Sequence, residues 1–378
     1  MVYKRAWAEI SLSNLAHNLG VIRENLNSQT RLMGIVKADA YGHGAVPVSK
    51  KLIEGGVNDL GVAICEEGVE LRENGITVPI LIMGFTPEPL LCEVVRFDLA
   101  QTVFTKSGAI ALAAEAAKQG KKATVHIKID TGMSRLGFLP NADSVKQIAE
   151  IAEIPHLNIQ GIYTHLATSD ELANDFMFEQ LSRFEWVLNE LTKLGINIPE
   201  KHIANSGAFS HMFSSAGYKG FYLDAARIGI MLYGYPPSAE MGETCVPLNL
   251  KPVMRLMSRV SMVKELEAGV GISYGHIYKT TKKSTIAVLP IGYADGYPRR
   301  LSHGGRVLVN GQFANVAGAI CMDQCMVDIT GIQNVNPGDP VVMMGEPGIC
   351  ADNLAEIVGT ISYEILCGIG KRVPRIYV

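Results

Sequence analysis

Residues 31–54 read RLMGIVKADAYGHGAVPVSKKLIE and contain one complete strand-and-helix unit. Residues 32–36 form a short apolar run of strand length, and residues 45–54 repeat apolar side chains at helical spacing. The segment between them, Tyr41-Gly42-His43-Gly44, is rich in glycine, which is typical of a loop. We therefore predict a β-strand, a glycine-rich loop and an α-helix in this order.

The same alternation continues along the chain to residue 236. Each apolar run is followed by a helical pattern, and prolines and glycines mark the joints. Eight such units within roughly 200 residues predict an α/β fold with a parallel (β/α)₈ barrel. A doubly wound sheet is less favoured because the first strand lacks G-x-G-x-x-G. The predicted strands are 32–36, 60–64, 80–83, 100–104, 124–129, 159–164, 202–204 and 222–226, and the helices include 45–54, 66–73, 106–119, 144–152 and 176–194.

The pattern changes after Tyr235-Pro236-Pro237, where short β-branched runs alternate with turns such as Asn310-Gly311. This pattern predicts a mainly-β C-terminal domain with strands at 257–263, 285–289, 306–309, 324–329 and 340–344. Residues 7–12 also alternate and are expected to pair into that domain. We place the barrel at 14–236 and the β domain at 237–378, together with the N-terminal strand within 1–13.

The composition excludes several classes of protein. The 378 residues carry a net charge of −3 and no long basic run, so we expect neither nucleic acid nor a membrane surface as a partner. The N-terminus lacks the apolar core of a signal peptide, and no apolar run reaches the roughly 18–20 residues that span a bilayer. Seven scattered cysteines form no C-x-x-C pair, which predicts reduced thiols in a cytoplasm and no metal site.

Catalytic residues of such barrels lie where the strands end, so the residues after each predicted strand form the candidate site. Their cations and small polar groups are typical of a site for an anion with a nucleophilic amine. Lys37 follows the first strand, and its amine could form an imine with an aldehyde, although its spacing alone also fits a solvent-exposed lysine. The candidates are Lys37, Gly84, Lys128, Asp130, Arg135, His165, Asn205, Ser206, Arg227 and Gly229.

Nine motifs resemble those of the alanine racemase family and occur in the same order. The resemblance covers essentially the whole chain, including both predicted domains. It implies an enzyme that uses pyridoxal 5'-phosphate (PLP) to interconvert L-alanine and D-alanine, with a barrel and a C-terminal β domain. The motifs are 36–44 (VKADAYGHG), 128–137 (KIDTGMSRLG), 164–165 (TH), 205–206 (NS), 226–234 (ARIGIMLYG), 271–275 (GISYG), 290–297 (PIGYADGY), 321–324 (CMDQ) and 362–364 (SYE).

The resemblance implies a reaction with two bases. Lys37 would hold PLP as a Schiff base and serve one face of the substrate, and Tyr274 of a second subunit would serve the other. Because a tyrosine pKa is usually about 10, we expect His165 and other cations to assist Tyr274. Arg227 would donate a hydrogen bond to the pyridine nitrogen, disfavour its protonation and restrict the reaction to proton return.

The resemblance also assigns binding roles. Hydroxyl and backbone N–H groups would hold the cofactor, together with the arginines and His165. Arg135 would contact the phenolic oxygen of PLP or the substrate carboxylate, and a narrow entrance would favour alanine, with serine the nearest competitor. The remaining cofactor residues would be Tyr41, Asn205, Ser206, Gly229, Ile230 and Tyr363, and the remaining substrate residues would be Tyr293 at the entrance with Met322 and Asp323 of the partner.

Three positions raise further questions. The resemblance implies that Lys128 is carbamylated and holds Arg135 as an anion, whereas the alternative is an unmodified lysine paired with Asp130. Ile228 stands where proline is usual, which predicts a less rigid local loop. Ala319 replaces a usual arginine, which puts in doubt one contact near the substrate carboxylate or the dimer interface.

Sites shared between two chains predict an obligate homodimer. The resemblance further implies a cytoplasmic bacterial enzyme that supplies D-alanine for peptidoglycan, in either a biosynthetic or a catabolic role. A PLP-dependent amino-acid decarboxylase of the same architecture remains an alternative, although it normally places an acidic residue at the pyridine nitrogen. A racemase that prefers serine and a non-enzymatic PLP carrier are further alternatives, and a carrier would not need Tyr274.

Overall fold

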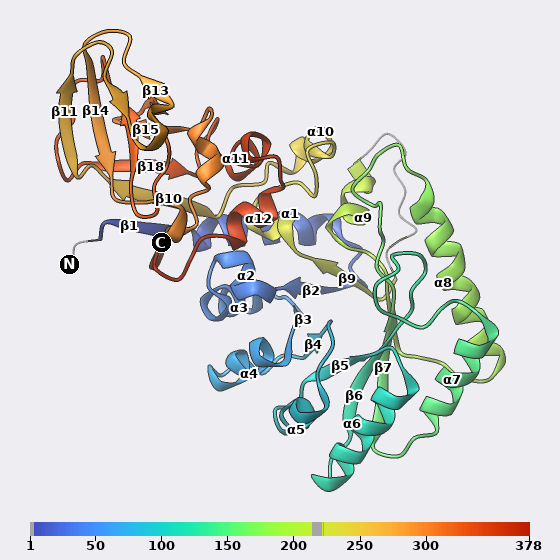
Figure 1. Cartoon of the computed structure of the whole chain (residues 1–378). Helices are drawn as coiled ribbons and strands as arrows, with labels where there is room; N and C mark the ends of the chain where they lie inside the picture. Colours follow the sequence, from blue (N-terminus) through green and yellow to red (C-terminus); the bar gives the residue numbers. More distant parts are fainter. Residues whose placement is uncertain (1–3, 214–220, 222) are drawn as a thin grey trace.

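Eight parallel strands close into a barrel in sequence order (Figure 1). The computed structural model describes residues 4–213, 221 and 223–378. Most buried residues of these strands are apolar, so the barrel encloses a packed core, which also holds buried polar residues such as His126 and His202. The barrel strands are β2 (Arg31–Ile35), β3 (Asp59–Val62), β4 (Ile80–Ile82), β5 (Ala100–Val103), β6 (Ala123–Lys128), β7 (Leu157–Tyr163), β8 (Glu200–His202) and β9 (Ala225–Ile228).

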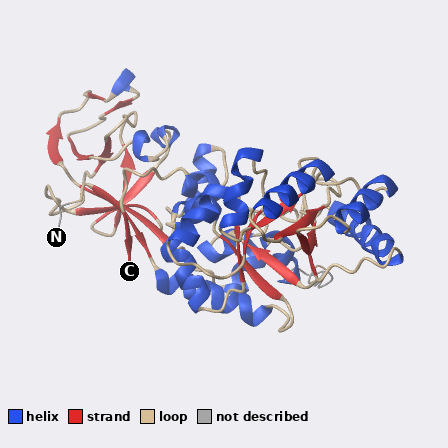
Figure 2. Cartoon of the chain, turned by 90° about the horizontal axis from the view of Figure 1, so that it is seen from below, coloured by secondary structure: helices blue, strands red, loops and turns tan. Residues whose placement is uncertain are grey.

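Helices lie around the barrel strands and bury their apolar sides against them (Figure 2). Ser11, Thr105 and Asn141 begin three of these helices, and each side chain accepts a hydrogen bond from a backbone N–H of the first turn. The helices of this part are α1 (Leu12–Asn25), α2 (Lys37–Gly42), α3 (Ala45–Glu54), α4 (Cys65–Glu73), α5 (Leu91–Arg96), α6 (Lys106–Lys118), α7 (Ala142–Ala152), α8 (Phe176–Lys193) and α9 (Ser206–Ser210).

The predicted barrel is confirmed, but several predicted strands differ in extent from the observed ones; the predicted strand 202–204, for example, shares only His202 with β8. The last barrel strand is β9 and not 222–226, and Tyr222 lies outside the described residues. The prediction ended this strand before Arg227, because a charged residue usually marks the end of a buried strand. In the structure Arg227 lies within β9 and its side chain is buried inside the barrel. The predicted strand 257–263 is divided between β10 (Met254–Arg259) and β11 (Met262–Leu266), because the chain changes its partner there: Arg259 pairs with Pro340, whereas Met262 pairs with Val288.

The C-terminal part is a nine-stranded sheet with the order β11-β14-β17-β16-β15-β18-β10-β1-β19. Its mainly-β character agrees with the prediction. The sheet also contains β16 and β19, which the prediction did not include. Beyond β10 and β11, its strands are β1 (Ala6–Ile10), β14 (Ser284–Leu289), β15 (Arg306–Val309), β16 (Gln312–Val316), β17 (Cys325–Asp328), β18 (Pro340–Met344) and β19 (Arg375–Tyr377), and a separate pair is formed by β12 (Gly271–Ile272) and β13 (Tyr278–Lys279).

Strand β1 lies between β10 and β19, as expected for the N-terminal strand. It is antiparallel to β10 and parallel to β19, so both ends of the chain enter the same sheet (Figure 1). The entire barrel is therefore inserted in the chain between two neighbouring strands of the sheet.

The C-terminal part also contains three helices. Helix α10 (Gly242–Cys245) precedes β10, and helices α11 (Ala351–Val358) and α12 (Ser362–Cys367) lie between β18 and β19 in the sequence. Helix α12 packs against α2 of the barrel and brings the ring of Tyr363 to 5.9 Å from that of Tyr41. The C-terminal part thus contributes to the barrel rim of its own chain. None of the helices in the described part of the chain has the length and apolar content that crossing a membrane requires.

Candidate active site

A cavity of about 540 Å³ opens at the carboxyl ends of the barrel strands. Its position agrees with the usual location of active sites in such barrels. The cavity gathers residues from α2, from β6 and β7, from the segments after β8 and β9, and from α12. Of the sequence-predicted site residues, it is lined by Lys37, Tyr41, Gly84, Lys128, Arg135, His165, Asn205, Ser206, Arg227, Gly229, Ile230 and Tyr363.

Lys37 is the first residue of α2 and lies on the cavity wall. The four residues that follow it, Ala38 to Tyr41, all have φ near 53° and form a left-handed turn. Such a turn strains L-residues by about 1–2 kcal/mol each. Glu67 holds the turn by accepting a hydrogen bond from the Ala38 N–H at 2.6 Å. Burial, and then the charge of Arg135, lowers the pKa of the Lys37 amine, which favours its neutral, nucleophilic form.

A small polar cradle lies between the start of α9 and the end of β9. The Ser206 hydroxyl accepts a hydrogen bond from the Gly229 N–H at 3.0 Å. A Cβ atom at position 229 would lie 2.5 Å from the Tyr41 hydroxyl oxygen, so only glycine allows this close approach. Asn205 caps α9 by accepting a hydrogen bond from the Ala208 N–H. The hydroxyl and N–H groups here suit a phosphate.

Arg227 is buried in the floor of the cavity, with 3% of its surface exposed. Its guanidinium donates to the backbone carbonyls of Thr164, His202 and Ile203 at 2.8–3.1 Å. It forms no ion pair with a carboxylate among the described residues. Burial lowers the pKa of Arg227 to about 10, so the group remains a cation at neutral pH. The cavity floor is therefore a fixed hydrogen-bond donor.

His165 lies beside Arg227, and its Nδ1 is 3.3 Å from a guanidinium nitrogen of Arg227. Because a guanidinium can only donate, Nδ1 of His165 must be the acceptor and its proton must be on Nε2. Burial, and then the charge of Arg227, lowers the pKa of His165 well below its usual value. His165 is thus a neutral imidazole whose remaining N–H can orient another group.

Lys128 is buried at the end of β6, with its Nζ 4.5 Å from the centre of the Tyr163 ring. Burial, and then the charges of Arg227 and Arg135, lowers the pKa of Lys128 well below its usual value. The expected alternative, an ion pair with Asp130, is absent among the described residues. Asp130 instead accepts hydrogen bonds from the backbone N–H groups of Gly132, Ser134 and Arg135.

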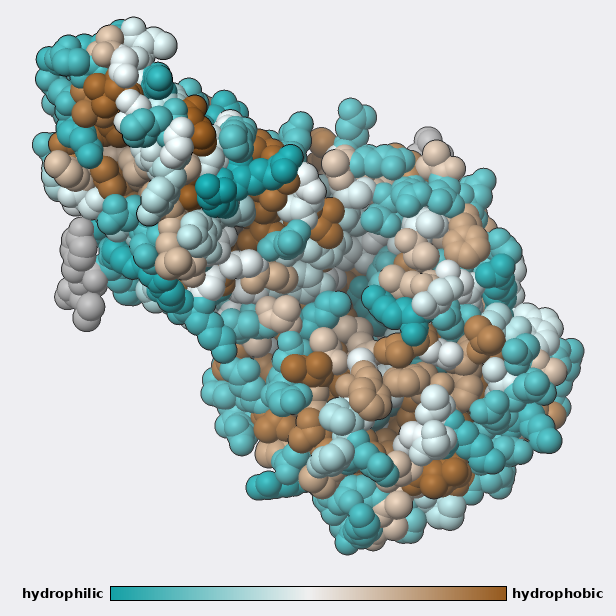
Figure 3. Space-filling model, in the orientation of Figure 1, coloured by the Kyte–Doolittle hydropathy of each residue, from teal (hydrophilic) through white to brown (hydrophobic). Residues whose placement is uncertain are grey.

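Four predicted residues lie in the β domain and do not line the cavity of their own chain. Tyr274, Tyr293 and Met322 are 72%, 42% and 53% exposed, although their side chains are aromatic or apolar. Asp323 is also exposed and is held by Arg372 at 2.7 Å. Apolar patches are visible on the face of both the β domain and the barrel in Figure 3. Exposed groups of this kind are typical of surfaces that meet a partner.

The two positions that depart from the family pattern have clear surroundings. Ile228 is fully buried inside β9, where it pairs in register with Gly34. The expectation of a less rigid loop at Ile228 was therefore wrong, because the residue belongs to a strand. Ala319 is also buried, and its carbonyl accepts a hydrogen bond from the Ser273 hydroxyl at 2.6 Å, next to Tyr274.

A group of buried polar residues inside the barrel is not among the residues predicted from the sequence. His126, Glu200 and His202 lie close together inside the barrel and could supply ligand atoms for a metal, which the sequence did not predict. The sequence spacing could have identified His126, because it stands two residues before the predicted site residue Lys128 on the same strand. Because side chains alternate along a strand, both must point to the same side. Tyr163, whose ring stacks on His202 at 4.6 Å, was also missed.

Comparisons with known proteins give one consistent result over nearly the whole chain. Residues 10–237 match the family model of the alanine racemase N-terminal domain, and residues 253–377 match that of the C-terminal domain. Alanine racemase 1 of Clostridium acetobutylicum is 46% identical over 375 residues, which cover 98% of this chain and 95% of that protein.

Solved structures agree with this result. Alanine racemase of Clostridium difficile 630 superimposes with a TM-score of 0.95 at 41% identity and covers 100% of this chain and 97% of that one. Alanine racemase from Bartonella henselae with covalently bound pyridoxal phosphate has a TM-score of 0.86 at 29% identity and covers 100% of both chains.

Proposed function

The chain belongs to the alanine racemase family and is an isomerase of alanine, and from this premise we propose how its residues interconvert L-alanine and D-alanine. The observation that carries the proposal is the position of the Lys37 amine on the wall of a cavity whose floor is the buried Arg227. This arrangement offers a nucleophilic amine, a hydrogen-bond donor and a polar cradle around one space.

The residues of the cavity fit PLP. Lys37 supplies the amine that would hold its aldehyde carbon, and Arg227 supplies a donor for its pyridine nitrogen. Ser206, Gly229 and Tyr41 surround a cradle that a Cβ atom would fill, which suits the phosphate. Asn205, Ile230, Arg135 and Tyr363 complete the wall. When bound, PLP supplies an electron sink that weakens the Cα–H bond of an amino acid.

Lys37 serves as the base on one face of the substrate. A lowered pKa leaves its Nζ able to accept the Cα proton at neutral pH and to return it. Glu67 and the left-handed turn fix the start of this side chain. Arg135 carries a positive charge near Lys37, and its guanidinium has no hydrogen-bond or ion-pair partner in the described part of the chain. It is therefore available for the substrate carboxylate or the phenolic oxygen of PLP.

Tyr274 of a second copy serves as the base on the opposite face. In its own chain this side chain is 72% exposed and lies outside the cavity, so it needs the cavity of another copy. There, the Nε2–H of His165 would orient the Tyr274 hydroxyl. Met322 and Asp323 of the same copy would line the side of the substrate carboxylate, and Tyr293 would narrow the entrance. These assignments make the active form a homodimer.

Arg227 restricts the reaction to proton transfer. A carboxylate at the pyridine nitrogen would keep that nitrogen protonated, whereas a guanidinium disfavours protonation. The described cavity lining contains one carboxylate, that of Asp170, and it forms no ion pair with Arg227. This arrangement disfavours the decarboxylase alternative, and the requirement for Tyr274 disfavours a PLP carrier.

Lys128 is proposed to be carbamylated. A buried cation between Arg227 and Arg135 is unfavourable, and the lowered pKa leaves the amine neutral and able to react with carbon dioxide. The carbamate would be an anion able to hold Arg135. The intact mass of the native protein should then include one added carboxyl group per chain, which Lys128→Ala should lack. An equal mass per chain, apart from the substitution, would contradict the modification.

The direct test follows L-alanine in deuterated buffer with the purified holoenzyme. We expect deuterium at Cα together with decay of the optical rotation to zero. Exchange without loss of rotation would contradict the two-base arrangement, and release of carbon dioxide would indicate the decarboxylase. Repeating the assay with L-serine measures how well the narrow entrance excludes the nearest competitor.

The setting of the reaction is part of the same proposal. We assign the domains to 14–236 and to 237–378 with the N-terminal strand within 1–13. All seven cysteines are free thiols, which supports a cytoplasmic location. D-alanine produced there would serve peptidoglycan synthesis. A strain that lacks the gene should then require D-alanine for growth, unless a second racemase is present.

A further inference from the structure

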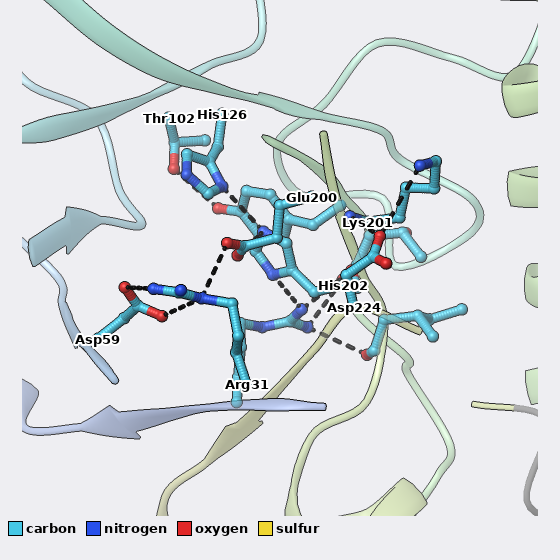
Figure 4. Close-up of polar contacts among 12 residues, drawn as sticks. Arg31, Asp59, Thr102, His126, Glu200, Lys201, His202 and Asp224 are labelled. Atoms are coloured by element: carbon cyan, nitrogen blue, oxygen red, sulfur yellow. Dashed lines mark hydrogen bonds and ion pairs between the residues drawn. The ribbon is translucent and has the colours of Figure 1, made fainter. Parts of the chain in front are cut away.

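Beneath the cavity, inside the barrel, lies a chain of buried polar side chains (Figure 4). Nδ1 of His126 is 2.9 Å from Nε2 of His202, and Nδ1 of His202 is 2.9 Å from a guanidinium nitrogen of Arg227. His202 is fully buried and His126 is 5% exposed. Neither histidine lines the cavity, and His126 is linked to Arg227 through His202.

The donor and acceptor roles in this chain can be assigned completely. A guanidinium has no acceptor atom, so Nδ1 of His202 must carry a lone pair and accept from Arg227. The proton of the neutral His202 is then on Nε2, where it can only be donated to Nδ1 of His126. His126 must therefore be protonated on Nε2. Burial lowers the pKa of His126 to about 3, and burial together with Arg227 lowers that of His202, so both rings are neutral.

A metal ion could in principle occupy the same place, because ligand atoms of His126, His202 and Glu200 lie within 4.8 Å of one another. A metal on Nε2 of His202 would require the ring proton to be on Nδ1. That proton would point at Arg227, which can only donate. Metal-bound histidines instead turn their other N–H toward an acceptor. The contact with Arg227 therefore excludes a metal at His202.

We propose that His126 is a positioning residue for the racemase reaction, because it accepts the Nε2 proton of His202 and so keeps Nδ1 of His202 available to hold Arg227. This inference rests on the proposed role of Arg227 as the donor to the pyridine nitrogen. His126 does not touch the substrate or the cofactor. It acts through one ring, whose tautomer it fixes.

Glu200 contributes charge to the same arrangement. Its Oε1 is 4.0 Å from Nε2 of His202 and has no hydrogen-bond partner, while Oε2 is 3.5 Å from Arg31 (Figure 4). Arg31 is also paired with Asp59 at 2.6 Å. Burial raises the pKa of Glu200 to about 7, so only part of this group is ionised at neutral pH, and its ionised form favours the cationic form of Arg227. Glu200 thus lies near His202, and His126 remains the nearer acceptor of the His202 proton.

Neutron diffraction from holoenzyme crystals exchanged into D₂O tests the proton positions directly. We expect deuterium on Nε2 of both His126 and His202 and none on either Nδ1. Deuterium on Nδ1 of His202, or a metal between the two rings, would overturn the proposal. The deuterium positions do not depend on turnover. A failure of this proposal can therefore be distinguished from a failure of the proposed racemase mechanism.

Two substitutions at position 126 test the consequence for the reaction. His126→Asn places an oxygen near the position of Nδ1 and keeps an acceptor, whereas His126→Leu has a similar size and none. We expect the leucine variant to lose about tenfold in kcat/KM, the scale of one lost hydrogen bond, while the asparagine variant stays within about threefold. The visible absorption band of bound PLP should shift in the leucine variant alone, because Arg227 is no longer held.

Circular dichroism and PLP content establish whether both variants fold and bind the cofactor. Equal losses in the two variants, or no loss in either, would contradict the positioning role. If the leucine variant does not fold, the asparagine variant and the neutron structure still decide the question, because a retained absorption band and the assigned proton positions are both required.

Discussion

At the scale of single residues, Arg227 determines the proton positions around the cavity. It can only donate, and it contacts one ring nitrogen each of His165 and His202. Both rings must therefore carry their proton on Nε2. One of these protons faces the cavity and the other faces His126. A single buried cation thus sets the hydrogen-bonding direction on both sides of the site.

Tyr274→Phe should separate the two faces of the reaction. The variant loses one of the two bases, so racemisation should fall by about 10²–10⁴-fold in at least one direction, which initial rates from L-alanine and from D-alanine would measure. Tyr297→Phe is the matched control, because the buried Tyr297 hydroxyl has no hydrogen-bond partner. Its removal should leave both rates unchanged. Equal activity of the Tyr274→Phe variant and the parent would refute the two-base assignment.

The buried histidines predict sensitivity to acid. Burial lowers the pKa of His126 from 6.5 to about 3, so between these values the folded state binds fewer protons than the unfolded state. Stability is therefore fully present above pH 6.5 and is lost as the pH falls toward 3. His126→Asn should reduce the slope of the unfolding free energy against pH, near pH 5, by about 1.4 kcal/mol per pH unit.

Denaturant titrations at several pH values and one protein concentration measure this slope. The control is His156→Asn, since His156 is exposed on the surface and asparagine tolerates its positive φ of 65°. The control measures the change in slope that replacing a surface histidine causes by itself. If the His126→Asn slope equals that of the parent, His126 does not change its protonation on unfolding.

The sequence identified the residues that lie around the cavity but not those beneath it. Lys37, His165 and Arg227 stand in motifs that the family resemblance marks, and all three reach the cavity. His126 and His202 become partners only when β6 and β8 are placed on either side of β7. No local pattern contains that contact, because it depends on the closure and register of the barrel. The roles of the residues around the cavity remain predictions.

At the scale of elements, the left-handed turn after Lys37 contradicts the helix propensity of its residues. Helix-forming residues such as Ala38 and Ala40 would favour a right-handed turn, yet Ala38 to Tyr41 all have φ near 53°. The turn persists because several contacts hold it. Besides Glu67, Asp39 accepts from the Ala45 N–H at 2.6 Å, and Arg375 donates to the Gly42 carbonyl at 2.9 Å.

Ala38→Gly tests the strain of this turn. Ala38 is exposed, so the substitution removes little packing, and glycine adopts a positive φ without the clash of a Cβ atom. We expect a gain of up to about 1 kcal/mol in the free energy of unfolding. Ala114→Gly, at an exposed position inside α6, should instead cost about 1 kcal/mol. Destabilisation by both substitutions would contradict the left-handed turn.

The sequence predicted the order and type of the barrel elements, but not all of their ends. Predicted strand 306–309 and helix 45–54 coincide with β15 and α3, because turn residues flank both. The last barrel strand was misplaced, because Arg227 and two alanines lack an apolar pattern. Strand β16 and helices α11 and α12 were not predicted. Each is a short element, so its sequence pattern is too brief to identify it.

At the scale of the whole molecule, each site is proposed to need two chains. The cavity holds Lys37, whereas the exposed Tyr274 of the β domain does not line the cavity of its own chain. A site shared in this way has a reciprocal arrangement in a symmetric dimer. Each chain then gives one base to its own site and one to the site of its partner.

Hybrid dimers test this arrangement. Lys37→Ala and Tyr274→Phe chains, each inactive alone, should recover activity when they are unfolded and refolded together. A mixed dimer contains one site with both substitutions and one intact site, so about a quarter of all sites should be restored after random pairing. Steady-state rates of the mixture measure the recovery. No recovery, despite mixed dimers seen by mass spectrometry, would place both bases in one chain.

The position of β1 between β10 and β19 also sets an order for synthesis on the ribosome. Strand β1 is made first, but its neighbours begin at Met254 and Arg375, after the entire barrel has been translated. The barrel can therefore close while the nascent chain still grows, whereas Trp7 and Ile10 have no partner strand until β10 has been made. We expect the nascent N-terminal strand to be a target for ribosome-associated chaperones, and completion of the sheet to follow release of the last residues.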